Sequence, residues 1–362
     1  MRVIAVTRDL GGDERRQRVV EHLEQKFETV RVVPRLPPLI RILNLVHSFN
    51  VRKDTWREQS KKNVFFFRAM SRAIRKSVMA VRQGPDDVVM IFEALFGPGT
   101  GGQIVKPFVM YEDGTSRMTL QRWPDWVPAT ARTPAYRQVE EETYKSADHV
   151  FTTSRWVQES LVRDYGVPPE RVSSVGQGHD FSPPPSLSAC TGPIIFVGYE
   201  FDRKGGPQLL EAFRQVRAVY PDAKLDLVGP ELRVSIPGVT VHGKISDKQR
   251  LQSLLHGAGI FVLPSLFDPN PHAAMEAMAM GLPVVTTDGC GTQEIIQDGI
   301  SGYVVPAGDV AALANRLLLL LRDPQLRLRV GHTGARRVNE TSNWPDVANR
   351  IAGRLESLRP GQ

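Results

Sequence analysis

The chain has 362 residues, of which 41% are hydrophobic and 23% charged, and carries a net charge of +7 at neutral pH. This composition is typical of a globular protein and excludes a disordered or fibrous chain. The length exceeds what one hydrophobic core usually organises, which predicts two domains. The longest apolar run, the leucines at 317–321, is far shorter than the roughly 18 residues that cross a bilayer, so we expect a cytoplasmic protein.

The first half alternates strands with helices. Residues 3–7 form a short apolar run that is followed by Gly11 and Gly12 and then by a helical stretch over 13–26. A strand, a glycine turn and a helix in this order open a Rossmann-like domain. Further strand-like runs follow at 29–33, 88–92, 105–111, 149–153 and 171–175. This alternation predicts a parallel sheet flanked by helices.

Positive charge is concentrated within the first half. Residues 35–82 contain twelve Lys or Arg side chains against two acids, Asp54 and Glu58, so the rest of the chain is mildly acidic. A basic segment of this kind predicts an anionic partner, and three remain open: a phospholipid surface, a polyprenyl-phosphate acceptor or nucleic acid. Nucleic acid is the weakest of the three, because no DNA- or RNA-reading motif accompanies the charge.

Within the basic segment, residues 63–81 have the periodicity of an amphipathic helix. Phenylalanines at 65–67 and Met70, Ile74 and Val78 alternate with a set of basic residues, which are Arg68, Arg72, Arg75 and Lys76. One interpretation is a helix that lies on an anionic membrane or holds a lipid-linked acceptor. The other is a helix whose apolar stripe packs in the core while its arginines face solvent.

A second alternation begins after three consecutive prolines at 183–185, where no helix continues and we place the domain boundary. The strand-like runs are 194–197, 224–228, 239–242, 260–263 and 283–287. The helical runs are 207–219, 247–256, 272–280, 310–321 and 324–339, and a last helix begins near Pro345. This pattern predicts a second Rossmann-like domain.

The segment 264–281 joins a predicted strand to a predicted helix and has the strongest chemical signal. Pro271 suits a helix start, and we expect the amides of His272, Ala273 and Ala274 to point out of the first turn, where a diphosphate would bind. An ordinary capped helix is the alternative that these residues leave open.

Two acids flank that helix start. Asp268 lies in the loop before it and Glu276 lies about one and a half turns inside it, so one would reach sugar hydroxyls and the other ribose hydroxyls. Two surface acids without a ligand are the alternative. The two cysteines show no metal-ligand spacing with each other or with any histidine, and we predict no metal site.

The segment from Asp268 to Gly281 resembles the signature of the family 4 glycosyltransferases. In it, Asp268 is followed after seven residues by Glu276, and then by Ala277, Met278 and Gly281. The similarity covers most of residues 140–340. It continues upstream and downstream in a set of glycines and charged residues, which are Gly198, Arg203, Lys204, Gly205, Gly289, Gly291, Glu294, Asp298, Gly299 and Gly302.

This resemblance implies the α/β fold called GT-B, in which two Rossmann-like domains face each other across a cleft. It implies an N-terminal acceptor-side domain over 1–181, a C-terminal nucleotide-sugar-binding domain over 186–343, and a helix over 344–362 that crosses back to the N-terminal domain. The implied activity is transfer of a sugar from a nucleotide-sugar donor to a hydroxyl acceptor, which is a glycan, a lipid-linked molecule or a small molecule. The resemblance also implies that anomeric configuration is retained, by a front-face displacement.

The resemblance implies no cofactor and no metal, because Lys204 and Arg203 would neutralise the charge that builds on the diphosphate. It makes Glu276 the residue that accepts from the ribose and Asp268 the one that binds the transferred sugar. The donor-binding residues that it assigns, from the leaving-phosphate loop to the base-contacting loop, are Gly11, Gly12, Gly198, Gly243, Ile245, Asn270, His272, Ala273 and Ala274.

The chain departs from the family pattern at two positions. The first acid of the pair is usually Glu, and Asp268 is one methylene shorter. Many members have a His after a strand of the N-terminal domain, where this chain has Glu112 and Asp113; we expect Asp113 to contact the sugar or the acceptor hydroxyl, unless it is a plain turn residue.

Two other functions stay open: a nucleotide-sugar epimerase or hydrolase of the same fold, and a non-catalytic relative that binds sugar nucleotides or lipids. If residues 35–82 bind an anionic membrane surface, the protein acts as a peripheral protein at the inner face of the membrane.

Overall fold

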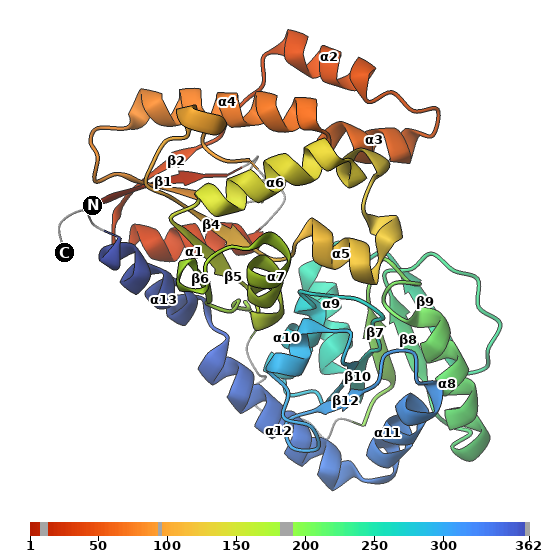
Figure 1. Ribbon diagram of the computed structural model, residues 1–362. Helices are drawn as coiled ribbons and strands as arrows, with labels where there is room; N and C mark the ends of the chain where they lie inside the picture. Colours follow the sequence, from red (N-terminus) through yellow and green to blue (C-terminus); the bar gives the residue numbers. More distant parts are fainter. Residues whose placement is uncertain (8–13, 93–95, 182–190, 359–362) are drawn as a thin grey trace. The chain divides into compact units, whose positions relative to one another are not determined.

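The computed structural model describes residues 1–7, 14–92, 96–181 and 191–358, which form two compact units (Figure 1). The first unit is Met1–Gly178 together with the chain from Trp344 onward, and the second is His179–Asn343. Each contains a six-stranded sheet whose neighbouring strands pair in parallel. Among the described residues, no helix has both the length and the apolarity to cross a membrane.

The first sheet has the order β2-β1-β3-β4-β5-β6. Its strands are β1 (Arg2–Val6), β2 (Glu28–Val32), β3 (Val88–Phe92), β4 (Phe108–Glu112), β5 (His149–Thr152) and β6 (Val172–Ser174). The helices of this unit are α1 (Glu14–Glu24), α2 (Pro38–His47), α3 (Lys53–Lys61), α4 (Val64–Val81), α5 (Ser116–Arg122), α6 (Pro134–Ser146), α7 (Arg155–Tyr165) and α13 (Trp344–Ser357).

The central strands β1, β3 and β4 of the first sheet are buried on both faces, which explains why they are nearly continuous apolar runs. On β1, Ile4 and Val6 face a core formed with α4, α6 and α7, whereas Val3 and Ala5 face a core formed with α1 and α13. The C-terminal helix α13 therefore packs beside α1 on the sheet of the first unit.

The amphipathic segment at 63–81 is the helix α4. Asn63 caps its start by accepting a hydrogen bond from the Phe66 N–H at 2.8 Å. Its apolar residues, which are Phe66, Phe67, Met70, Ile74 and Val78, are buried in the core of the first unit. The core interpretation of this stripe is therefore the right one, and the membrane interpretation of the same residues is wrong.

The second sheet has the order β12-β11-β10-β7-β8-β9. Its strands are β7 (Ile194–Val197), β8 (Leu225–Val228), β9 (Val239–Gly243), β10 (Ile260–Leu263), β11 (Val284–Thr287) and β12 (Tyr303–Val305). The helices are α8 (Gly206–Val219), α9 (Lys248–His256), α10 (His272–Ala279), α11 (Val310–Arg322) and α12 (Pro324–Thr341). Numbered within the unit, this is the common doubly wound order 3-2-1-4-5-6, which reverses direction between β7 and β10.

Candidate functional site

The second sheet has a topological switch point between β7 and β10. In open parallel sheets, ligands bind outside the carboxyl ends of the strands at such a point, because the two following loops diverge there. The loop after β7 contains Gly198, Arg203 and Lys204, and the loop after β10 runs through Asp268 to the start of α10. Residues that are about 65 positions apart in sequence are therefore brought to one edge of the sheet.

Two glycines let these loops pack closely. Gly205 has a φ of +72°, and a Cβ there would lie 1.9 Å from the Pro264 carbonyl oxygen. At Gly198, a Cβ would lie 2.4 Å from Cδ of Lys204. Glycine is needed at Gly205 for both backbone conformation and space, and Gly198 leaves room for the lysine stem. The Leu266 N–H then donates to the Arg203 carbonyl at 2.9 Å, which joins the two loops.

Asp268 lies at the centre of the site and is 5% exposed. Lys204 Nζ is 3.2 Å from its Oδ2, and Arg203 Nη1 is 3.7 Å from its Oδ1. Among the described residues Oδ2 has no hydrogen-bond donor, so its attraction to Lys204 is electrostatic. Removing a carboxylate from water costs on the order of several kcal/mol, and the charges of Lys204 and Arg203 offset this cost.

Arg203 is held in place from both sides. Its Nη1 donates to the Phe267 carbonyl at 2.6 Å, and its Nε donates to Glu200 Oε2 at 3.0 Å. The backbone of Asp268 is fixed as well, since its N–H donates to the Gly289 carbonyl at 2.8 Å and its carbonyl accepts from the Gly291 N–H at 2.9 Å. The charged groups are therefore pre-organised by the loops that carry them.

The start of α10 differs from the expected anion site. The His272 N–H donates to the Asn270 carbonyl at 3.0 Å, and the Ala274 N–H donates to the Pro271 carbonyl at 3.1 Å. The prediction that the amides of His272, Ala273 and Ala274 all point out of the first turn is thus wrong for two of them. The cause is a tight turn at Asn270 and Pro271, which uses these amides within the chain.

Two polar side chains lie near this turn. Asn270 Oδ1 is buried and has no hydrogen-bond donor among the described residues. Glu276 is partly buried on α10, at the same end of the sheet as Asp268. Their roles toward a sugar or ribose stay predictions.

The loop after β9 contains the predicted base-contacting residues. Gly243 ends β9 with a φ of +66°, and its carbonyl accepts from the Gly229 N–H at 2.8 Å. The Ile245 side chain is buried in the hydrophobic core, so a ligand would meet only its backbone. Its carbonyl accepts from the Tyr199 hydroxyl at 3.2 Å.

Tyr199 is a residue that the sequence reasoning missed. Its side chain follows β7 directly, is 58% exposed, and has Lys244 Nζ 5.8 Å from its ring centroid. An exposed aromatic ring next to the loop after β9 suits stacking with a flat ligand. The only signal in the sequence was an aromatic residue directly after Gly198.

The remaining predicted site residues belong to the first unit. Asp113 follows β4, is partly exposed, and lies 3.6 Å from Arg16 through Oδ2 and Nη2. Gly11 and Gly12 lie outside the described residues. Beside Asp113, Glu112 is 1% exposed at the end of β4. The structure therefore brings together Gly198, Arg203, Lys204 and Asp268, whereas Asp113 lies in a different unit.

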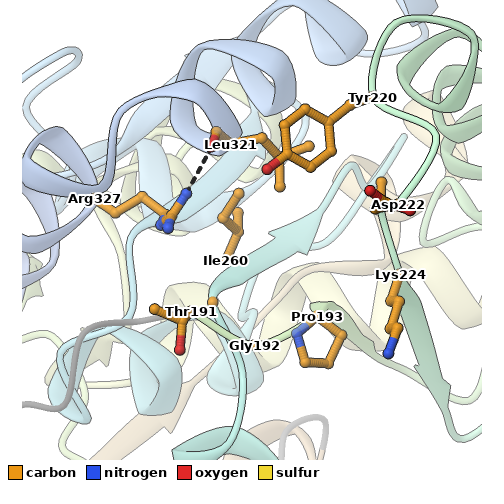
Figure 2. A pocket seen from close by; sticks show the side chains of 11 residues that line it. Thr191, Gly192, Pro193, Tyr220, Asp222, Lys224, Ile260, Leu321 and Arg327 are labelled. Carbon is orange, nitrogen blue, oxygen red and sulfur yellow. Dashed lines mark hydrogen bonds between the residues drawn. The ribbon is translucent and has the colours of Figure 1, made fainter.

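A cavity of about 300 Å³ lies at the opposite edge of the second sheet, where β7, β8 and β10 begin (Figure 2). Arg327 and Lys224 are among its lining residues. Arg327 Nη1 donates to the Leu320 and Leu321 carbonyls at 2.7 and 3.0 Å, which satisfies the last turn of α11. The cavity is at the amino ends of the strands and is not part of the candidate site.

Comparison with known families agrees with this architecture. The family described as Glycosyltransferase Family 4 matches residues 3–182, and the one described as Glycosyl transferases group 1 matches residues 192–323. Two Rossmann-like units with these domains define a protein of the GT-B fold, as predicted. The chain belongs to glycosyltransferase family 4.

Three similar proteins illustrate the range of the family and fold. A phosphatidyl-myo-inositol mannosyltransferase of Mycobacterium leprae is 32% identical over 56% of this chain and 56% of its own length. An MMP alpha-(1->4)-mannosyltransferase of Mycolicibacterium hassiacum is 30% identical over 75% of this chain and 70% of its own. An E. coli structure described as trehalose-6-phosphate bound with UDP-2-fluoro glucose covers 99% of both chains, with 11% identity and a TM-score of 0.73. The chain thus spans just over half the length of the mycobacterial mannosyltransferase named first.

Proposed function

We propose that this protein is a retaining glycosyltransferase that moves a sugar from a nucleoside diphosphate sugar to a hydroxyl acceptor without a metal. The observation that carries the proposal is the pair of cations, Arg203 and Lys204, beside the buried Asp268 at the switch point of the second sheet. Family membership supports the reaction class. The E. coli structure with a bound UDP-sugar analogue supports a nucleoside diphosphate sugar as donor.

In the proposed reaction, the bond between the anomeric carbon and the diphosphate oxygen breaks while the acceptor oxygen forms a bond on the same face of the sugar. The acceptor proton passes to the leaving phosphate. The negative charge that builds on the diphosphate is offset by Lys204 and Arg203, which replace a metal ion. Two unit charges about 4 Å apart interact by about 4 kcal/mol at an effective dielectric constant near 20, equivalent to roughly a thousandfold in rate.

Asp268 has two proposed roles in this site. Before the donor binds, it holds the lysine ammonium 3.2 Å away and so keeps the cation directed toward the switch point. When the donor is bound, its carboxylate accepts hydrogen bonds from hydroxyls of the transferred sugar, while Glu276 accepts from the ribose. The lysine then exchanges its contact with Asp268 for one with the diphosphate.

For the acceptor, we propose a hydroxyl on a lipid or lipid-linked molecule at the inner face of a membrane. Support comes from the basic segment at 35–82, with twelve cations against two acids, which is suited to an anionic surface. The name of the Mycobacterium leprae relative, a phosphatidyl-myo-inositol mannosyltransferase, agrees with an acceptor of this kind.

The test has two stages. Purified protein is first screened for thermal stabilisation by UDP-, GDP- and ADP-sugars, because a ligand that binds the native state raises its melting temperature. The stabilising donor is then incubated with lipid acceptors in the presence of EDTA, and the anomeric configuration of the product is determined. We expect a retained product in EDTA. Isomerised sugar and free nucleotide without an acceptor would favour an epimerase or hydrolase, and donor binding without turnover would favour a non-catalytic relative.

A further inference from the structure

The helix α2 is packed with its polar side inward. Asn44 is the one buried residue of this helix. Its Nδ2 donates to the Ser60 carbonyl at 2.7 Å, and its Oδ1 accepts from Asn63 Nδ2 at 2.9 Å. These bonds attach α2 to α3 and to the start of α4, so the helix is fixed to the unit through polar contacts.

The apolar side of α2 faces away from the protein. Leu39, Ile42, Leu43 and Val46 recur at helical spacing and are between 46% and 69% exposed. Phe49 and Val51, which follow the helix in the chain, are also exposed. Among the described residues, eight of the sixteen exposed large hydrophobic side chains lie between 33 and 51. Figure 1 shows α2 outside α4, as the outermost helix of this unit.

The charge around this surface is mainly positive. Residues 33–53 contain Arg35, Arg41, Arg52 and Lys53 and no acid, and the acids that follow in the chain are Asp54 and Glu58 of α3. The helix α4, which α2 contacts, has an outward stripe at a spacing of four residues, formed by Arg68, Arg72 and Lys76. In the part of the chain that the structure describes, no carboxylate pairs with these three side chains. Apolar residues within a basic surface suit an anionic lipid headgroup layer.

We propose that α2 is the membrane-docking element of this protein and lies in the interface of an anionic phospholipid bilayer. Leu39, Ile42, Leu43 and Val46 would enter the acyl boundary, and the basic residues of the 33–53 segment and of α4 would contact lipid phosphates. This proposal rests on the proposed function, because the membrane contact would bring the enzyme to a lipid acceptor. It assigns the docking surface to α2 and not to the apolar stripe of α4. A second copy of the chain is a poorer occupant, because two such surfaces would repel each other.

The experiment is flotation of the full-length protein with vesicles of phosphatidylcholine alone or mixed with phosphatidylglycerol, without any donor. We expect binding to the mixed vesicles that weakens with added salt. The double variant I42S/V46S should bind at least about tenfold more weakly, because two apolar side chains no longer leave water. The matched control V219S/L319S removes two exposed apolar side chains from α8 and α11 of the second unit and should bind like the wild type.

A second variant, R68E/R72E, tests the basic stripe and should lose binding to the mixed vesicles. Melting temperature and nucleoside diphosphate binding should be unchanged in all variants, which separates a failure of this proposal from a failure of the proposed function. Equal binding of I42S/V46S and the wild type would overturn it. So would a lipid-independent dimer of the wild type that I42S/V46S abolishes, since the surface would then belong to a second copy.

Discussion

The two units share one architecture and distribute their charged groups differently. Each has a six-stranded parallel sheet, with the order 2-1-3-4-5-6 in the first unit and 3-2-1-4-5-6 in the second. In the second unit, Arg203 and Lys204 lie beside Asp268 at the carboxyl edge of the sheet. In the first, cations such as Arg68 lie on an outer helix face, and the side chains at the interior include acids such as Glu140.

This difference indicates which unit offers charged groups to an anionic ligand. An anion can displace Asp268 from Lys204 without leaving a buried cation unpaired, which suits a site that binds a diphosphate. Glu140 in the first unit is fully buried, accepts from the Tyr165 hydroxyl at 2.9 Å, and has its pKa raised by burial. Glu140 therefore lies in the interior, where it offers no exposed charge to a ligand.

The largest effect should come from removing the lysine of the second unit. Lys204→Ala should lower kcat/KM for sugar transfer by about a thousandfold, because the charge that builds on the diphosphate loses one cation. Steady-state transfer assays measure this. Lys224→Ala, an exposed lysine at the opposite edge of the same sheet, should keep wild-type activity. Equal losses of kcat/KM in Lys204→Ala and Lys224→Ala would mean that sugar transfer does not depend on a lysine at the carboxyl edge of the sheet.

Gly205→Ala should be the most destabilising glycine substitution at this edge. The added Cβ would meet the Pro264 carbonyl at 1.9 Å in a left-handed backbone conformation, and we expect a loss of about 3 kcal/mol in the free energy of unfolding. Gly243→Ala has a similar φ but open space, so its loss should be about 1 kcal/mol. Urea titration of both variants gives the comparison. Similar losses would contradict the close packing of the two loops.

Asp268→Asn keeps the size of the side chain and removes its charge. Without the carboxylate, Lys204 loses the group that directs it, and the sugar loses a strong acceptor, so kcat/KM should fall about a hundredfold. Asp222→Asn, at the amino edge of the second sheet, is the control. Unaltered kinetics of Asp268→Asn would show that this carboxylate takes no part in sugar transfer.

The smallest effect concerns the first unit. Burial and the Arg354 guanidinium lower the pKa of His149 from 6.5 to about 4, so the folded state holds the neutral ring. As pH falls from about 6.5 to 4, the unfolded chain takes up a proton that the folded chain does not, and stability should drop by about 2 kcal/mol. Urea titrations across this range should show a flatter dependence for His149→Gln than for the control His256→Gln, whose ring is exposed. Parallel curves of stability against pH for the two variants would contradict the lowered pKa of His149.

Much of the fold could be predicted, because the central strands of both sheets are buried on two faces and are short apolar runs between turns. The ranges 88–92, 194–197 and 260–263 match β3, β7 and β10. The start of β4 was placed too early, at 105, since Val105 is buried without being in the strand. The short strand β12 was missed because its three residues give no periodicity.

The candidate site was predictable only in part. The cations at 203 and 204 and the acid at 268 were found through local motifs, although their contact depends on the packing of two distant loops. The amides of α10 were misjudged because a tight turn at Asn270 depends on backbone geometry. The helix α2 was missed because the predicted membrane surface was assigned to α4, a longer amphipathic helix whose apolar side packs in the core.

The affinity of the ligand-free protein for nucleoside diphosphates, measured by calorimetry with UDP, GDP and ADP, tests most directly whether the switch point of the second sheet binds the diphosphate. We expect that the nucleotide that binds wild-type protein binds Lys204→Ala at least about thirtyfold more weakly and Lys224→Ala equally well. Equal affinity of Lys204→Ala and wild-type protein for that nucleotide would contradict the claim that the switch point of the second sheet holds the diphosphate.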